Sequence, residues 1–186
     1  MLHPSIEVKD SSIHGTGLFA LELIPAHSVL WKLDPCDAPV KLEDIPKDKW
    51  HLAYSYRDDQ YVLTTDGSQY TNHSCDANTW WIDDETMTAS RDIFTGEEIT
   101  YDYATSEANY WHGWTCHCGA HNCRKVITGQ DCRRREFRQR YQGHLPSWTV
   151  AFIEQNSGIR GVLYRSKRRI HHCLWTIKRT VLPGSS

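Results

Sequence analysis

Long apolar runs are missing from this sequence of 186 residues. No stretch approaches the roughly 20 apolar residues that a membrane-spanning helix needs. The first apolar stretch, residues 13–24, is interrupted by histidine, glycine and glutamate, so it does not read as a secretory leader. These absences predict an intracellular protein, in the nucleus or the cytoplasm, with no membrane span.

Cysteine is placed too unevenly for a disulfide framework. The seven cysteines are an odd number, and an intracellular protein keeps its thiols reduced. Cys116, Cys118 and Cys123 fall within eight residues, whereas the remaining four are scattered along the chain: Cys36, Cys75, Cys132 and Cys173. Three thiolates this close, completed by a fourth ligand from elsewhere, suit a tetrahedral zinc ion. Three free thiols are the alternative.

Phenylalanine is also scarce, with four residues against eight Trp and nine Tyr. Aromatic side chains with a polar edge suit a half-wet pocket, although a Trp-rich core has the same composition. A hydrophobic content of 39% and a charged content of 24% are ordinary for a globular protein of one domain.

The small net charge of −2 conceals a strong asymmetry. Residues 1–131 hold 9 basic and 21 acidic residues, a net charge of −12, whereas residues 132–186 hold 12 and 2, a net charge of +10. An acidic body implies a basic partner that reaches it through long-range attraction. The basic end can bind a nucleic acid, an anionic surface or the body itself.

Short alternating segments predict a chain of strands joined by tight turns. Strands are expected near residues 6–8, 28–31, 61–65 and 99–103, and a hairpin at 80–82 and 87–89 with 83–85 as its turn. Residues 48–56 are expected to form one or two helical turns. The segment 111–129, rich in Cys, His and Gly, is expected to be irregular.

The character of the sequence changes beyond residue 131. Residues 133–141 and 147–155 each predict a helix, the second with Ser147 as N-cap and with Trp148, Ala151 and Phe152 on one face. An amphipathic basic helix is expected further on, because four apolar residues recur at helical spacing: Ile170, Leu174, Ile177 and Val181.

Four short segments carry chemical information. They are His14-Gly-Thr-Gly-Leu-Phe19, Tyr70-Thr-Asn-His-Ser-Cys-Asp-Ala-Asn78, Gly96-Glu-Glu-Ile-Thr-Tyr-Asp-Tyr103 and Trp114-Thr-Cys-His-Cys-Gly119 with Cys123. The first lets a backbone pass close to a ligand, but it lacks the strand-then-helix setting of a dinucleotide site. The second contains a Cys–His pair, yet residues two apart on a strand point in parallel, which disfavours nucleophilic catalysis.

Taken together and in this order, the four segments resemble those of the SET-domain protein lysine methyltransferases. The likeness covers roughly residues 5–129 and is greatest for the compact members with a cysteine-rich post-SET segment. It implies a mainly β structure with short helices: the β-clip arrangement of small twisted sheets, with a pseudoknot after the Asn-His motif. The expected division is residues 1–109 for the SET domain, 110–129 for the post-SET zinc segment and 130–186 for a basic, helical C-terminal extension.

The resemblance also implies a site. S-adenosylmethionine would contact the glycine turn, the Asn-His motif and the post-SET aromatic residue: Gly15, Thr16, Gly17, Leu18, Tyr70, Asn72, His73 and Trp114. Tyr103 would be the catalytic tyrosine, and Tyr101 would line the lysine channel. One structural Zn²⁺ would be held by Cys75, Cys116, Cys118 and Cys123, with His112, His117 and His121 as alternative fourth ligands. Gln69-Tyr70-Thr71 and Ala77 depart from the Arg-Phe-Ile and Pro that are usual in the family.

The implied function is S-adenosylmethionine-dependent methylation of a lysine in a basic protein such as a histone. A tyrosine at position 101 favours monomethylation, with dimethylation slower. The alternative is a catalytically silent SET module that binds lysine-rich peptides or a nucleic acid. The basic C-terminal extension makes a nucleic acid a candidate partner, and the sequence indicates neither the substrate lysine nor the oligomeric state.

Overall fold

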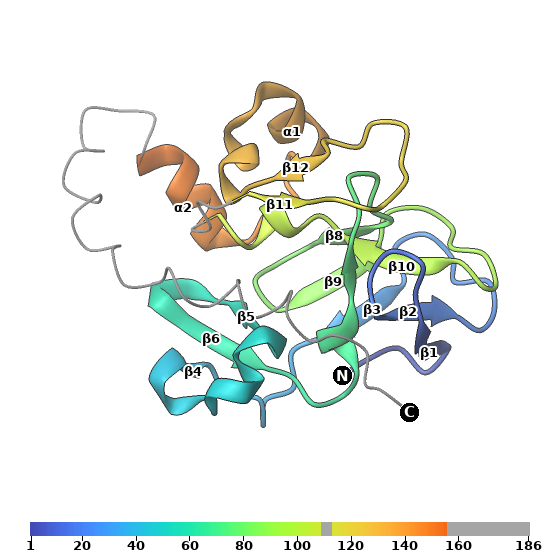
Figure 1. Cartoon of the computed structure of the whole chain (residues 1–186), viewed down its shortest axis with the longest axis horizontal. Helices are drawn as coiled ribbons and strands as arrows, with labels where there is room; N and C mark the ends of the chain where they lie inside the picture. Colours follow the sequence, from blue (N-terminus) through green and yellow to red (C-terminus); the bar gives the residue numbers. More distant parts are fainter. Residues whose placement is uncertain (109–112, 156–186) are drawn as a thin grey trace.

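A computed structural model of the chain describes residues 1–108 and 113–155 (Figure 1). Short strands dominate, and two α-helices follow them near the end of the described part. The mainly β fold with short helices, expected from the sequence, is confirmed. The Ile170–Val181 stripe, His112 and Cys173 lie outside the described residues.

The central sheet has four strands in the order β1-β2-β10-β7. They are β1 (Ile6–Asp10), β2 (Thr16–Ala20), β10 (Glu98–Tyr101) and β7 (Asn72–His73). β10 pairs antiparallel with β2 and parallel with β7, which sets Thr100 beside Asn72 and Tyr101 beside His73. Two segments singled out in the sequence therefore lie side by side in the sheet.

Three smaller sheets surround the central one. The first joins β3 (Val29–Lys32), β9 (Thr86–Ala89) and β8 (Thr79–Trp81), and its β8–β9 pair confirms the predicted hairpin. The second joins β4 (Val40–Lys41), β6 (Gln60–Leu63) and β5 (Ala53–Ser55). The third pairs β11 (Trp114–Thr115) with β12 (Val126–Ile127).

The buried side chains form separate clusters between these sheets. An aliphatic cluster under the central sheet contains Leu18, Ile24, Leu30, Ile93 and Ile99. An aromatic cluster is built from Trp31, Tyr56 and Trp81, with Tyr54, Tyr101 and Trp148 packed against it. Burial of a large aromatic side chain gives the greatest apolar stabilisation per residue, so this second cluster explains much of the unusual Trp and Tyr content.

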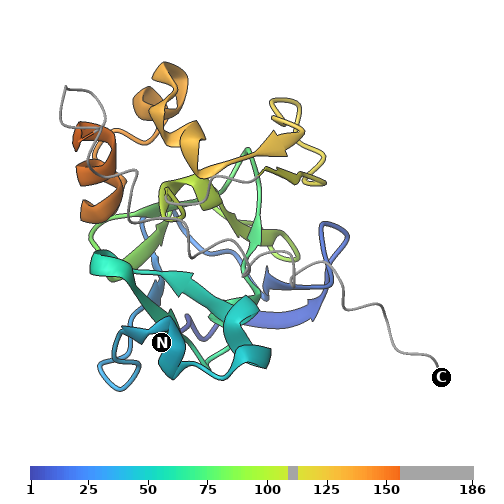
Figure 2. The same ribbon diagram turned by 60° about the vertical axis from the view of Figure 1, so that its left-hand side comes forward.

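The helices α1 (Arg135–Arg140) and α2 (Ser147–Gln155) follow β12 in the chain. α1 lies on the far side of the molecule from the β4-β6-β5 sheet (Figures 1 and 2), whereas α2 contacts η3 (Arg57–Asp59), the turn between β5 and β6. Both helices were expected, but α1 is shorter than residues 133–141. Arg133 ends the 3₁₀ turn η6 (Gly129–Arg133), and Arg134 has an extended backbone.

Three other expectations need correction. Only residues 48–52 of the segment 48–56 are helical, as part of a 3₁₀ helix (η2, Lys47–Leu52), because Ala53–Ser55 pairs with β6. The strand at 99–103 ends at Tyr101, and Tyr103 begins another 3₁₀ turn, η5 (Tyr103–Thr105). Ser147 does not cap α2, since the N–H groups of Thr149 and Val150 donate to the Pro146 carbonyl.

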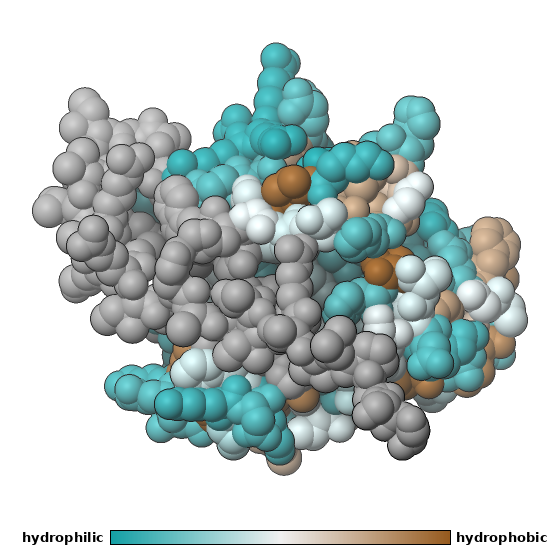
Figure 3. All heavy atoms as spheres, viewed as in Figure 1, coloured by the Kyte–Doolittle hydropathy of each residue, from teal (hydrophilic) through white to brown (hydrophobic). Residues whose placement is uncertain are grey.

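The surface seen in Figure 3 is mostly hydrophilic over its described residues. Exposed apolar side chains do occur, and the most open are Phe94 at 64%, Met1 at 58% and Val126 at 54%. Within residues 1–108 and 113–155, no helix has the length and apolar character to cross a membrane.

Candidate active site and metal centre

Asn72 organises the glycine turn that joins β1 to β2. Its side-chain Nδ2 lies 3.1 Å from the carbonyl oxygen of His14, 3.0 Å from that of Thr16 and 2.8 Å from Oε1 of Glu98. Asn72 is itself buried in β7, so its amide is fixed relative to the central sheet. These bonds hold the turn around Gly15 in one conformation.

The two glycines of this turn are there for different reasons. Gly15 has φ +47°, in the left-handed region that other residues avoid, and a Cβ built on it would meet nothing within 4 Å. A Cβ on Gly17 would lie 2.3 Å from Oε1 of Glu98, which also accepts a 2.8 Å bond from the Ser11 hydroxyl. Gly17 therefore makes room for Glu98, whereas Gly15 leaves open space beside the backbone.

Tyr103 stands at the start of the turn that ends β10. The Asp102 carboxylate caps this turn by accepting from the Ala104 N–H, and Nδ1 of His73 accepts from the Tyr103 N–H at 3.1 Å. The Tyr103 hydroxyl donates to the Thr71 carbonyl at 3.0 Å. Both ends of the residue are thus fixed by the segment that leads into β7 and by β7 itself.

The ring of Tyr103 stands between two other aromatic residues. Its centroid is 4.7 Å from that of Tyr101 and 5.8 Å from that of Trp114. Burial, and then the negative charge of Glu107, raise the pKa of both tyrosines above the ordinary value. The two phenols therefore stay protonated near neutral pH, so they can donate or accept hydrogen bonds but do not act as bases.

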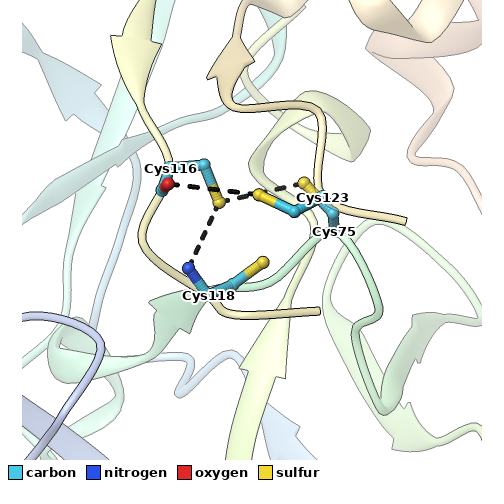
Figure 4. Close-up of side chains that lie close together, drawn as sticks. All are labelled: Cys75, Cys116, Cys118 and Cys123. Atoms are coloured by element: carbon cyan, nitrogen blue, oxygen red, sulfur yellow. Dashed lines mark hydrogen bonds between the residues drawn. The ribbon is translucent and has the colours of Figure 1, made fainter. Parts of the chain in front are cut away.

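Four thiols converge on one point (Figure 4). The sulfur atoms of Cys75, Cys116, Cys118 and Cys123 all lie within 4.8 Å of one another, and those of Cys75 and Cys116 are 3.8 Å apart. Zinc–sulfur bonds of about 2.3 Å in a tetrahedron place the sulfurs about 3.8 Å apart, so this donor set fits Zn²⁺. Cys75 comes from the loop after β7, and the other three come from the segment between β11 and β12.

N–H groups surround the sulfurs. The backbone N–H of Arg124 donates to Cys75 at 3.3 Å, and that of Lys125 donates to Cys123 at 3.4 Å. Nε2 of His73 lies 3.4 Å from the Cys75 sulfur. The contact with Cys116, and then these hydrogen bonds from His73 and Arg124, lower the pKa of Cys75 despite its burial. Such donors favour the thiolate that a metal requires.

His73 connects the thiol cluster with the tyrosine turn. Because its Nδ1 accepts from the Tyr103 N–H, the neutral ring carries its proton on Nε2 and donates it to the Cys75 sulfur. The side chain is buried, with 5% exposed. One imidazole therefore fixes the distance between the candidate metal ligand and the candidate catalytic residue.

A buried ion pair adds a second connection between the same parts. Arg124 donates from Nη2 to Asp102 at 2.6 Å, and its Nε lies 3.6 Å from Asp131. The side chains of Asp102 and Asp131 are only 2% and 4% exposed. Arg140 of α1 donates from Nη1 to the Cys75 carbonyl at 3.0 Å. The segment after β11 is thus held by charged groups as well as by thiols.

The structure brings most of the sequence-predicted residues together, but four stand apart. The Leu18 side chain lies in the core, so only its backbone is available to a ligand. Tyr70 is 37% exposed. His117 and His121 are exposed, and the group of thiols does not include them. These two histidines could ligate a metal by their chemistry, but their positions do not place them in the cluster.

Several contributors were missed from the sequence: Ser11, Glu98, Asp102, Arg124 and Arg140. Glu98 and Asp102 belong to a segment that was singled out, yet their partners come from distant positions. Nothing in the local pattern indicates that Glu98 faces Gly17 or that Arg124 faces Asp102. Only the position of Arg124, directly after a cysteine of the cluster, offered a signal.

Comparisons with known proteins agree with this geometry. The family model of the SET domain matches residues 15–104. Human histone-lysine N-methyltransferase 2D is 32% identical over 131 residues, which are 62% of this chain and 2% of that protein. Histone-lysine N-methyltransferase ASHH3 of Arabidopsis thaliana is 45% identical over 67 residues, 32% of this chain and 18% of that protein. The chain therefore spans a small part of these relatives.

Among solved structures, KRYPTONITE in complex with mCHG DNA and SAH is similar with a TM-score of 0.51. The match covers 67% of this chain and 29% of that one, at 22% identity. At this low identity the likeness shows a shared fold and nothing more.

Proposed function

Residues 15–104 of this chain belong to the SET-domain family, and on that premise we propose that the protein is an S-adenosylmethionine-dependent protein-lysine N-methyltransferase. The observation that carries the proposal is the arrangement around Tyr103. Its hydroxyl is held by the Thr71 carbonyl, its N–H is held by His73, and its ring lies between Tyr101 and Trp114. A module that only bound peptides would not require this fixed phenol.

The cofactor site is proposed along the glycine turn and the Asn72-His73 strand. Gly15 leaves open space beside the backbone, and Asn72 holds the turn in place. Thr16, Gly17 and Leu18 continue the same backbone into β2. Trp114, next to Tyr103, would cover the adenine ring, and the partly exposed Tyr70 is a candidate contact for the amino-acid part. When bound, the cofactor supplies an electrophilic methyl group.

The side chains of this chain would act by alignment. A lysine amine must reach the methyl group in line and without its proton, and a narrow apolar channel contributes to both requirements. Removal from water lowers the pKa of the amine, since burial disfavours its charged form. The protonated Tyr103 and Tyr101 orient the amine through their hydroxyl oxygens, and ring faces tolerate the cationic product. No residue of special basicity is required.

Tyr101 is the proposed limit on the number of methyl groups. A phenol hydroxyl at the end of the channel can hold a water molecule in the space that a second methyl group would need. Displacing that water without replacing its hydrogen bonds costs on the order of 1–2 kcal/mol, about tenfold in rate. We therefore expect mainly monomethyllysine, with slower dimethylation.

One structural zinc ion is proposed at Cys75, Cys116, Cys118 and Cys123. Four thiolates would fill all four coordination positions of a tetrahedral zinc ion, so none is left for a catalytic water. Its binding would hold the segment between β11 and β12 against the loop after β7, which carries Cys75. Metal binding of this kind contributes directly to the free energy of folding.

The substrate is proposed to be a basic protein such as a histone. The net charge of −12 over residues 1–131 favours a positively charged partner, and the matched relatives are named histone-lysine N-methyltransferases. A solved structure of KRYPTONITE holds an H3(1–15) peptide and mCHH DNA. Three statements stay predictions: a nucleic acid contact through the basic residues after 131, a location in the nucleus or the cytoplasm, and the boundary at residue 129.

The test is methyl transfer from labelled S-adenosylmethionine to a panel of basic proteins, followed by mass spectrometry of the modified peptides. We expect label on lysine in at least one histone or other basic protein. A chain that binds lysine-rich peptides but transfers no label would instead support the silent SET module.

A further inference from the structure

The start of α2 contacts the turn that carries Tyr103. The Trp148 indole Nε1 donates to the Ser106 carbonyl at 2.9 Å, and the Thr149 hydroxyl donates to the Thr105 carbonyl at 2.7 Å. Thr149 is fully buried. Thr105 is the last residue of η5, which begins at Tyr103, and Ser106 follows it. α2 lies outside the region 15–104 that matches the SET domain.

The Trp148 ring also supports the wall behind Tyr101. It lies 5.2 Å from the Tyr56 ring and 6.2 Å from the Trp81 ring, measured between centroids. Trp81 in turn lies 6.5 Å from Tyr101, with the ring planes at 86°. An edge-to-face row of rings therefore runs from α2 through Trp81 to the residue expected to limit methylation.

Further hydrogen bonds hold both α2 and the Tyr103 turn in place. Ser147 donates from its backbone N–H and its hydroxyl to Asp84, each at 2.6 Å, which ties the first residue of α2 to the turn between β8 and β9. Trp81 donates from Nε1 to the Thr105 hydroxyl at 3.0 Å, and that hydroxyl donates to the Asp102 carbonyl at 2.7 Å. Thr105 is therefore held on one side by Trp81 and on the other by α2.

From these contacts we propose that the start of α2 positions the catalytic turn, with Trp148 and Thr149 as positioning residues for Tyr103 and Tyr101. The proposal rests on the methyltransferase function proposed above. Neither residue contacts the reacting atoms. Their effect is indirect, since a displacement of about 1 Å in a residue that aligns two reactants lowers the rate on the order of 100-fold.

Residues 147–155 would thus have a role in catalysis that the rest of the C-terminal extension does not share. A helix that only covered apolar surface would change stability when altered, and the turnover of the folded enzyme would remain. A positioning element changes the turnover number and the methylation state of the product at temperatures where the variant is fully folded. The cofactor site, which is formed by the glycine turn and β7, should be unaffected.

The test compares Trp148→Ala, Trp148→Phe and Thr149→Val in the full chain, with Val150→Ala as the matched control. Val150 lies in the same helix and is 40% exposed. Folding is checked by circular dichroism, cofactor affinity by calorimetry with S-adenosylhomocysteine, and kcat, KM and product state with a lysine substrate that the wild type methylates.

We expect Trp148→Ala to lower kcat by about 10- to 100-fold and to alter the ratio of mono- to dimethyllysine, with cofactor affinity close to that of the wild type. Trp148→Phe should recover part of the rate, because it restores the ring but not the bond to Ser106. If Trp148→Ala does not fold, Thr149→Val, which keeps the side-chain shape, decides through the same decrease in kcat.

An active wild type in which folded Trp148→Ala or Thr149→Val turns over as fast as Val150→Ala overturns this inference alone. A wild-type chain that methylates no lysine overturns the proposed function as well.

Discussion

Removing the guanidinium of Arg124 should destabilise the protein far more than its position in a surface segment suggests. Arg124 is 13% exposed and faces two carboxylates, those of Asp102 at 2.6 Å and Asp131 at 3.6 Å. In Arg124→Met the apolar part of the side chain is kept, but Asp102, which is 2% exposed, loses its cationic partner. Breaking one half of a buried ion pair in this way costs about 3–5 kcal/mol.

Arg134→Met serves as the control, because it removes an ordinary, solvent-exposed ion pair. Arg134 also pairs with Asp131, at 3.0 Å, but its side chain is 58% exposed. Solvent screens such a pair, so its loss should cost no more than about 1 kcal/mol. For a chain of this length, about 3–5 kcal/mol corresponds to a decrease in Tm of roughly 6–20 °C.

The assay is thermal and urea unfolding of zinc-loaded protein, followed by circular dichroism, for Arg124→Met, Arg134→Met and the double variant Arg124→Met/Asp102→Asn. The double variant should regain part of the lost stability, because it leaves no unpaired buried charge. The reasoning is refuted if Arg124→Met and Arg134→Met unfold at the same temperature and urea concentration.

Four further outcomes follow from the site. Gly17→Ala should weaken S-adenosylhomocysteine binding in calorimetry about tenfold, because the new Cβ displaces the Glu98 carboxylate from its bonds; unchanged affinity would contradict the role of this turn. Cys118→Ser should reduce both the zinc content of the purified protein and its cofactor affinity, and wild-type protein free of metal by elemental analysis would exclude the zinc site. Tyr101→Phe should shift products towards di- and trimethyllysine, an expectation that fails if the wild type reaches trimethyllysine equally fast. The full chain should bind nucleic acid with an affinity that falls steeply as salt rises, and deletion of residues 156–186 should weaken this binding. Equal gel shifts with and without this segment would argue against a nucleic acid partner.

The sequence predicted the strands and the cysteine cluster because both have local signatures. Alternation of apolar residues and a turn at Asp83–Glu85 indicate the β8–β9 hairpin without reference to other segments. The spacing of Cys116, Cys118 and Cys123 likewise indicates a metal site. The turn at Tyr103 was missed because its cause is tertiary: Asp102 and His73 hold its backbone, whereas the apolar pattern alone continues the strand.

The C-terminal helices illustrate the same limit in another way. The positive charge after residue 131 suggested a contact with a nucleic acid, an anionic surface or the body of the protein. In the structure Arg140 of α1 bonds to the Cys75 loop, and the uncharged Ser147 at the start of α2 bonds to Asp84. A charge pattern along a sequence does not distinguish a partner outside the molecule from one inside it. The distinction depends on contacts between residues more than 60 positions apart.

The most direct test of the account is the mass of a basic substrate protein after incubation with S-adenosylmethionine and either wild-type chain or Tyr103→Phe. Tyr103 donates to Thr71 through the hydroxyl that this variant lacks. We predict that the wild type adds the mass of one methyl group to a single lysine and that Tyr103→Phe, folded and with its zinc retained, adds almost none. Equal methylation by the two proteins, or none by the wild type across a panel of histones and other basic proteins, would contradict the central claim.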